Sequence, residues 1–202
     1  MRTLLIEPTQ VGASVADVLT SAGHEVVHCH EAGAPAFPCA GLTDDGCPLE
    51  GHGEIDAAVA VRDDAAPQPT AEESGVTCAI RAGLPVVVLG PDGPNPFADW
   101  TEPCAAADEL PAAIDRAVEA TAARRAAPMR DEVLRVLVTE GVDAGEVQVQ
   151  VVREGDTAQV MIRTEHPLDE KVANTVATRV HAVDAKGSWP TKKLGVAVGL
   201  IG

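Results

Sequence analysis

The sequence predicts an α/β protein: a doubly wound parallel sheet of the flavodoxin type, followed by a small α+β domain with the order α-β-β-α-β. In the first 125 residues, short and almost wholly apolar segments alternate with helical patterns, which is typical of a parallel sheet covered on both faces. In residues 129–202, apolar and polar residues alternate along three segments, which is typical of half-buried strands. Apolar residues make up 46% of the 202 residues and charged residues 23%, so the chain has enough apolar side chains for packed cores.

The elements expected in the first domain, residues 1–125, follow from apolar spacing and from glycines. Four apolar runs predict strands at 3–6, 25–29, 55–61 and 85–89, and a fifth strand is expected shortly before Cys104. Helical stripes predict helices at 11–22 and 71–81 and one from about 108 to 125. Gly23 and Gly83 supply the stops of the first two helices.

A boundary is expected at residues 126–128, Ala-Ala-Pro, because the pattern of elements changes there. The second domain is predicted as residues 129–202, with helices around 133–138 and 172–183. Its strands are expected at 147–151, 158–163 and 194–200, the first two joined by a hairpin turn at Glu154-Gly155-Asp156. Both helices would lie on one side of this three-stranded sheet and leave its other face open.

The net charge of −16 excludes several partners. Residues 1–125 carry 6 basic and 20 acidic side chains, and residues 126–202 carry 9 and 11. Such a field repels phosphate backbones, so neither a nucleic acid nor an anionic membrane is expected as a partner. A solubilising surface is the simpler interpretation, and attraction for a basic partner is the alternative. The chain has no apolar run of the roughly 18 residues that span a membrane and no secretory signal pattern, so a cytoplasmic protein is expected.

Residues 1–120 resemble the receiver domain of bacterial response regulators. The matching segments are Leu4-Leu5-Ile6, Ser21-Ala22-Gly23-His24-Glu25-Val26-Val27, Ile55-Asp56-Ala57-Ala58-Val59-Ala60-Val61, Ala82-Gly83-Leu84-Pro85-Val86-Val87-Val88-Leu89 and Thr101-Glu102-Pro103. The resemblance implies a flavodoxin-like sheet and a role in signalling. It does not extend to the second domain.

The positions that perform receiver chemistry carry other residues. The resemblance places Glu7 where an acidic pair holds magnesium, and Val61 where an aspartate accepts the phosphoryl group. It places Gly90 at the hydroxyl residue and Glu102 at the conserved lysine. Aspartyl phosphate formation needs a carboxylate nucleophile, a divalent ion and a cation on the phosphoryl oxygens. The sequence therefore predicts a degenerate receiver, or pseudo-receiver, that cannot be phosphorylated.

A Cys/His-rich loop replaces the helix that receivers have between the second and third strands. Its metal-ligand candidates are His28, His30, Cys39, Cys47 and His52. Imidazole and thiolate bind transition metals and iron–sulfur clusters, so a transition metal such as zinc, or an iron–sulfur cluster, is the cofactor that this loop would hold. The spacing matches no known metal site. A Cys39–Cys47 disulfide is one alternative, and a loop with neither a metal nor a disulfide is the other. Cys78 and Cys104 are expected to be small buried residues.

The second domain is expected to bind a protein partner or a second copy through its open sheet face. The residues expected on this face are Gln148, Gln150, Gln159, Arg163, Gly195, Ala197 and Gly199. Small and polar residues on an open sheet are compatible with water, so a solvated monomer is the alternative.

The sequence is compatible with three functions and indicates no catalytic residue. A non-catalytic regulatory or interaction protein is the leading hypothesis, and a thiol or metal-binding redox or metal-sensing module is the alternative. An enzyme acting on a small molecule is the weakest, because only Glu7, Asp63 and Asp64 are expected at the carboxyl ends of the strands.

Overall fold

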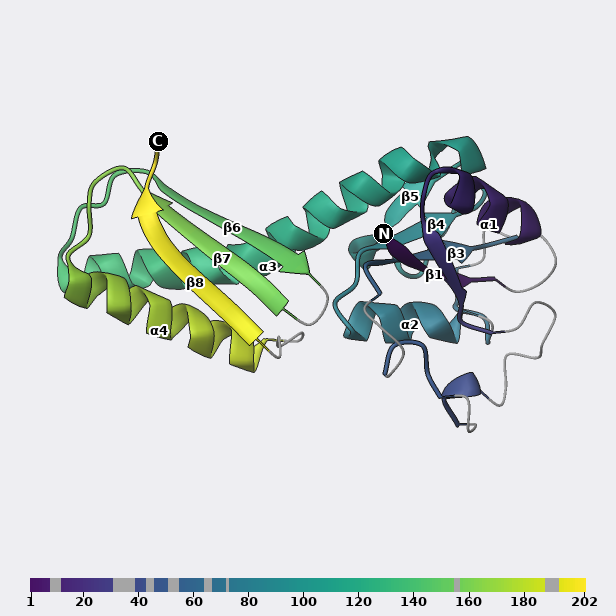
Figure 1. The fold of residues 1–202 in the computed structure, drawn as a ribbon, viewed down its shortest axis with the longest axis horizontal. Coiled ribbons are helices and arrows are strands. Elements are labelled where there is room, and N and C mark those ends of the chain that lie inside the picture. The colour runs from purple at the N-terminus through teal and green to yellow at the C-terminus, as the bar shows by residue number, and fades with distance from the viewer. Residues whose placement is uncertain are drawn as a thin grey trace. The chain divides into compact units, whose positions relative to one another are not determined.

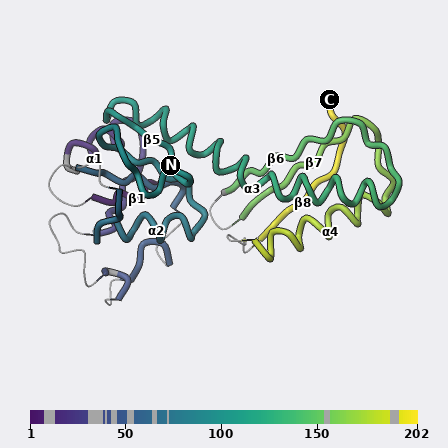
Figure 2. The backbone as a smooth tube through the Cα atoms, turned by 180° about the vertical axis from the view of Figure 1, so that it is seen from behind, coloured from purple at the N-terminus to yellow at the C-terminus, as the bar shows by residue number. Residues whose placement is uncertain are grey.

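The chain forms two compact units, Met1–Glu119 and Ala120–Gly202. The computed structural model describes residues 1–7, 12–30, 39–42, 46–50, 55–63, 67–71, 73–154, 157–187 and 193–202. The backbone of each unit can be followed in Figures 1 and 2.

The first unit is a five-stranded, all-parallel sheet with the strand order β2-β1-β3-β4-β5. Its elements are β1 (Arg2–Ile6), α1 (Gly12–Ser21), β2 (Glu25–His28), η1 (Ala40–Leu42), β3 (Ala57–Val61), α2 (Ser74–Arg81), β4 (Val86–Leu89), η2 (Ala98–Trp100), β5 (Glu102–Cys104) and η3 (Ala107–Glu109). This order and the interleaved helices confirm the predicted doubly wound sheet and are consistent with a flavodoxin-like fold.

Helices cover both faces of this sheet, which explains why β3 and β4 are apolar at every position. On one face, Leu5 and Val59 pack in a core with Leu19 of α1 and with Ile114 of α3 (Leu110–Glu140). On the other face, Leu4, Ala58, Ala60, Val86 and Val88 share a core with the α2 residues Val76 and Ala79. Figure 1 shows α1 and α2 on opposite sides of the strands.

Helix α3 is continuous from Leu110 to Glu140, so the predicted helix end near Arg125 is wrong. Pro128 lies inside it. A proline in a helix loses one backbone hydrogen bond and normally disfavours the turn before it. Here strong helix formers, Ala-Ala-Arg-Arg-Ala-Ala, precede the proline, and Ala126 and Met129 beside it are buried in the core of the second unit. Packing of this segment outweighs the local cost of the proline.

The second unit is a three-stranded mixed sheet with α3 and α4 (Glu170–Lys186) on one face. The strands are β6 (Val147–Glu154), β7 (Thr157–Thr164) and β8 (Lys193–Leu200). Strand β7 is central, antiparallel to β6 and parallel to β8, which confirms the predicted α+β unit. The Asp169 side chain caps α4 by accepting a hydrogen bond from the Val172 amide, at 2.8 Å. The predicted turn residues Gly155 and Asp156 lie outside the described residues.

Candidate functional site

The carboxyl edge of the parallel sheet is where a receiver would carry out its chemistry. Strand register places Val61 beside Leu89, and Leu89 beside Cys104, so these residues mark that edge. Glu7 follows the last residue of β1, and Gly90 follows the last residue of β4. Three of the four predicted degenerate positions, Glu7, Val61 and Gly90, therefore end neighbouring strands.

Glu102, the fourth position, lies further back in the sheet. It is the first residue of β5 and pairs with Val87, two residues before the edge. Its carboxylate pairs with the Arg116 guanidinium of α3, with Nε and Oε1 2.6 Å apart. This acid is therefore paired with a cation of its own unit, and it lies two residues before the edge at which a receiver would bind a phosphoryl group.

A buried ion pair lies directly after Val61, and sequence reasoning missed it. The Arg62 Nε contacts a carboxylate oxygen of Glu73, which precedes α2, and the side chains are only 5% and 6% exposed. Arg62 also donates a hydrogen bond to the Pro94 carbonyl at 3.0 Å. The other carboxylate oxygen of Glu73 accepts a hydrogen bond from the Thr70 amide at 2.7 Å. The edge that would hold a phosphoryl group in a receiver therefore contains a guanidinium whose charge a carboxylate already neutralises.

Gly90 leaves no room for the hydroxyl side chain that receivers place there. A Cβ at Gly90 would lie 2.7 Å from the Arg62 carbonyl oxygen, which is closer than real Cβ contacts come. A cavity of about 280 Å³ adjoins this point. It is lined by Arg62, Val88, Gly90, Pro91, Asp92, Gly93, Pro94, Asn95, Pro103, Cys104, Ala105 and Glu109. The lining has one cation, Arg62, and two acids, so it favours no anion.

Glu7, at the position that the receiver resemblance assigns to a metal-binding acid, is buried. Its side chain is 5% exposed, and one oxygen lies 3.3 Å from the His28 Nδ1. The exposed Asp63 follows Arg62 in sequence, and Asp64 lies outside the described residues. The described edge thus has no pair of carboxylates of the kind that holds a divalent ion in receivers.

The structure brings two of the predicted metal-ligand candidates together. Cys39 and Cys47 flank η1, and a Cβ at Gly41 would lie 3.7 Å from the Cys39 Sγ and 3.0 Å from the Cys47 Cβ. His30 lies beside a different cysteine, with its Nε2 3.8 Å from the Cys29 Sγ. His28, as described above, pairs with Glu7. His52 lies outside the described residues.

The remaining cysteines lie in two different places. Cys104 is buried at the end of β5, as predicted, and its thiol donates to the Ala106 carbonyl at 3.1 Å. Cys78 of α2 is exposed, so its predicted burial is wrong. Burial raises the pKa of the Cys29 thiol to about 12, and the charges of Cys39, Cys47 and Cys78 contribute to the increase. Among the described residues, no three His, Cys, Asp or Glu side chains already stand in an arrangement that would hold a metal ion.

On the sheet face of the second unit that was predicted to be open, the strand register aligns residues of β6, β7 and β8 in three cross-strand rows. These rows are Gln148–Arg163–Gly199, Gln150–Met161–Ala197 and Val152–Gln159–Gly195. The Gln159 side chain lies over Gly195, where a Cβ would come into direct conflict with its amide oxygen. Gln148, Gln150, Ala197 and Gly199 are exposed, because α3 and α4 pack on the opposite face.

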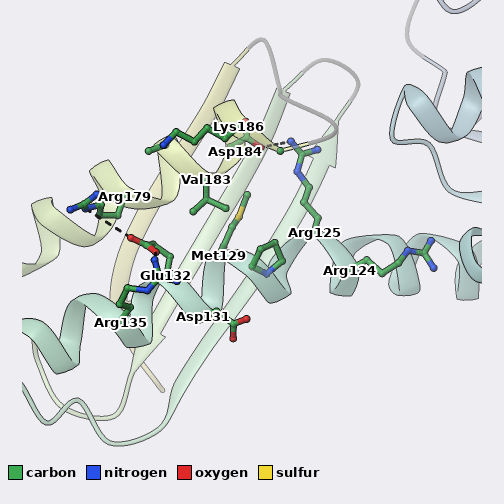
Figure 3. A pocket seen from close by; sticks show the side chains of 13 residues that line it. Arg124, Arg125, Met129, Asp131, Glu132, Arg135, Arg179, Val183, Asp184 and Lys186 are labelled. Atoms are coloured by element: carbon green, nitrogen blue, oxygen red, sulfur yellow. Dashed lines mark hydrogen bonds and ion pairs between the residues drawn. The ribbon is translucent and has the colours of Figure 1, made fainter.

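A groove of about 660 Å³ lies between α3 and α4 in the second unit. Figure 3 shows its charged side chains; two ion pairs join α3 to α4, and a third lies within α3. Arg125 lies 2.5 Å from Asp184, and Glu132 contacts both Arg135 at 2.6 Å and Arg179 at 3.9 Å. The lining residues are Arg124, Arg125, Pro128, Met129, Asp131, Glu132, Arg135, Arg179, Ala182, Val183, Asp184, Lys186 and Gly187. Four charged side chains of this groove form ion pairs that join the two helices, so these pairs support packing of α3 against α4.

Comparisons of the chain with models of protein families and with curated proteins found no match. Within the described residues, no helix combines the length and the apolar character that a membrane crossing needs.

Proposed function

We propose that this protein is a non-catalytic regulatory protein whose receiver-like unit does not accept a phosphoryl group and whose second unit pairs with another copy of the chain. The observation that carries the first part is the buried Arg62–Glu73 ion pair at the carboxyl edge. Separating such a pair leaves a buried charge without compensation, which costs several kcal/mol. A phosphoryl group on this edge would have to compete with Glu73 for the guanidinium.

The neighbouring positions support the same proposal. Val61 offers no nucleophile, and the Arg62 carbonyl allows no side chain at Gly90. Glu7 would remain as one carboxylate, whereas magnesium in phosphoryl transfer needs several oxygen ligands and the substrate phosphate. A domain that keeps the sheet but lacks these groups is suited to contact other proteins.

The open face of the second unit supports pairing with a second copy. Arg163 is the one charged residue of its three rows, so two copies would meet with little repulsion of like charges. Strand β8 adds an edge of eight residues with a single charge, Lys193, and among the described strands it pairs only with β7. An edge of this kind is open to pairing with another strand.

Phosphoryl transfer tests the first part of the proposal directly. The full chain is incubated with acetyl phosphate and magnesium, and its intact mass is measured. We expect no added mass, because no carboxylate occupies the acceptor position. An adduct of about 80 Da that hydroxylamine removes is the mark of an acyl phosphate and would contradict the proposal.

The Asp63→Asn variant is the matched control for this experiment. Asp63 is the exposed carboxylate nearest to the acceptor position in sequence. An adduct that disappears in this variant would show that the acceptor has moved two residues along the chain. Equal, unmodified masses for wild type and variant are the expected outcome.

A further inference from the structure

The core of the second unit is less completely covered at β8 than at β6, the other edge strand of the sheet. The core-facing β8 residues Leu194, Val196 and Val198 pack against this core but are only half-buried. Their register partners on β7 are all fully buried. On β6, Val147 and Val151 are 5% and 4% exposed. Apolar surface of the core is therefore left in contact with water along β8.

The backbone of β8 directs hydrogen-bonding groups outward at this same edge. The Ile201 amide, directly after β8, donates to the Thr164 carbonyl of β7 at 3.0 Å. In a parallel pair, a residue that bonds to the neighbouring strand uses both its N–H and its C=O, and every second residue does so. Odd-numbered residues of β8 therefore bond to β7. The residues that direct N–H and C=O away from β7 are Leu194, Val196, Val198 and Leu200.

We propose that two copies of the chain join edge to edge through β8, antiparallel, so that their three-stranded sheets become one continuous sheet. This inference rests on the pairing of second units proposed above and names the surface that carries it. A twofold axis normal to the sheet makes the two β8 strands antiparallel and keeps the helices of both copies on one face. Each strand then supplies the donors and acceptors that the other directs outward.

The direction of the backbone groups restricts the register of this pair. In an antiparallel pair, residues that direct N–H and C=O toward the partner strand face one another. An even-numbered residue of β8 therefore faces an even-numbered residue of the second copy. The register that uses the whole strand pairs Leu194 with Leu200, Val196 with Val198, and Ala197 with its own counterpart.

This register suits the charge and the apolar residues of β8. Lys193 is the only charged residue of the strand, and it faces Ile201 of the second copy instead of another lysine. No like charges oppose each other along the pair. The half-buried apolar residues of one copy gain apolar neighbours on the same face from the other. The second copy therefore extends the core at the edge where the helices of one copy leave it uncovered.

The Val196→Pro variant tests the edge in the full chain, and Val196→Ala is its matched control. Proline removes an N–H that points away from β7, so the pairing of β8 with β7 is retained. Alanine removes side-chain volume but keeps the N–H. In light scattering, Val196→Pro should give 20.8 kDa at concentrations where wild type and Val196→Ala reach twice that mass. Circular dichroism verifies that both variants are folded.

The Gln150→Arg variant separates edge pairing from pairing through the open sheet face. Gln150 lies on β6, in the middle row of that face and on the strand farthest from the β8 edge. Edge pairing predicts a dimer as in the wild type. A dimer that is lost in Gln150→Arg and survives in Val196→Pro would overturn edge pairing but leave the proposed association of second units intact. A monomeric wild type would contradict both.

Cysteine cross-linking tests the register without a proline. Ala197 would face its own counterpart in a pair without mutual hydrogen bonds, with Cα atoms about 4.5 Å apart, which is within reach of a disulfide. Two copies of Gly199 would lie about 14 Å apart, four residues along the strands. Under mild oxidation, Ala197→Cys should form a covalent dimer, while Gly199→Cys and the wild type, with its five cysteines, give only background. Equal cross-linking in both variants, or none in Ala197→Cys, would overturn the proposed register.

Discussion

Single residues decide what the carboxyl edge of the parallel sheet can do. Gly90 ends up against the Arg62 carbonyl, and Arg62 in turn holds Glu73 in the interior. Each residue restricts the next, because backbone, guanidinium and carboxylate occupy the space that a phosphoryl site requires. Under the proposed function, the inability to accept a phosphoryl group would follow from the packing of this edge as well as from Val61 at the acceptor position.

Replacement of Gly90 tests this packing. In Gly90→Ala the new Cβ would lie 2.7 Å from the Arg62 carbonyl oxygen, so the backbone must shift. Such overpacking typically costs about 1–3 kcal/mol of unfolding free energy. Urea denaturation should show a loss in Gly90→Ala and a larger loss in Gly90→Thr. Stability equal to the wild type in both variants would show that the edge is looser than described.

His24 provides a pH-dependent test at the same scale. Its Nδ1 lies 2.9 Å from the Thr3 hydroxyl, and burial followed by the N-terminal charge lowers its pKa below 6.5, against the opposing effect of Asp115 and Asp56. The unfolded chain therefore gains a proton near pH 6.5 that the folded chain takes up only at lower pH. The contribution of His24 to the free energy of unfolding is therefore fully present above pH 6.5 and decreases as the pH falls through that value.

The comparison with His24→Gln isolates this group from the other titrating residues. Unfolding free energy is measured for both proteins between pH 5 and pH 8. The wild type should lose more stability than the variant as the pH falls through 6.5. A variant with the same or a steeper decrease would contradict the account.

At the scale of elements, the strands and glycine stops were predictable, whereas the long helix was not. The apolar runs around Leu5, Val59 and Val87 define buried strands, because only a sheet covered on both faces accommodates them. Pro128 indicated a helix end, since local chemistry disfavours proline there, but burial of Met129 outweighs it. Local patterns reveal the element type, and tertiary packing decides whether two patterns join.

The candidate sites were less predictable than the elements, because their residues meet across long sequence separations. Cys39 and Cys47 form a visible pair within one loop, and the structure keeps them together. Cys78 lies on α2, where burial is expected from the sequence, but the structure exposes it. No sequence pattern links Glu73 to Arg62, and only the position of α2 beside β3 brings the two charges together.

Helices α3 and α4 allow a prediction about buried and exposed ion pairs. Asp184 is 6% exposed and pairs with Arg125, which is 10% exposed. Asp184→Ala leaves that guanidinium buried without this carboxylate, which should cost about 3–5 kcal/mol. Glu140 makes a matched pair across the same helices with Lys171, whose side chain is 80% exposed. Glu140→Ala should therefore change stability by less than about 1 kcal/mol.

Thermal or urea unfolding of both variants distinguishes the two ion pairs. A large loss in Asp184→Ala beside a small one in Glu140→Ala is the expected result. Equal effects would show that burial does not set the strength of these contacts.

At the scale of the whole molecule, the two units carry different charge and different surfaces. The 20 acidic and 6 basic side chains of residues 1–125 keep this part of the chain apart from other acidic surfaces. Residues 126–202 are close to neutral, and their open sheet face has one charged row member, Arg163. Association of two copies through the second unit is the arrangement that this distribution favours.

Light scattering of the full chain over a range of concentrations tests this association most directly. We expect a mass of twice 20.8 kDa at high concentration that falls toward 20.8 kDa on dilution. Ala197→Arg, which places a charge in the middle row of the open face, should give 20.8 kDa throughout. The exposed Ala123→Arg on α3 should behave as the wild type. A wild-type mass of 20.8 kDa at every concentration would contradict the proposed pairing.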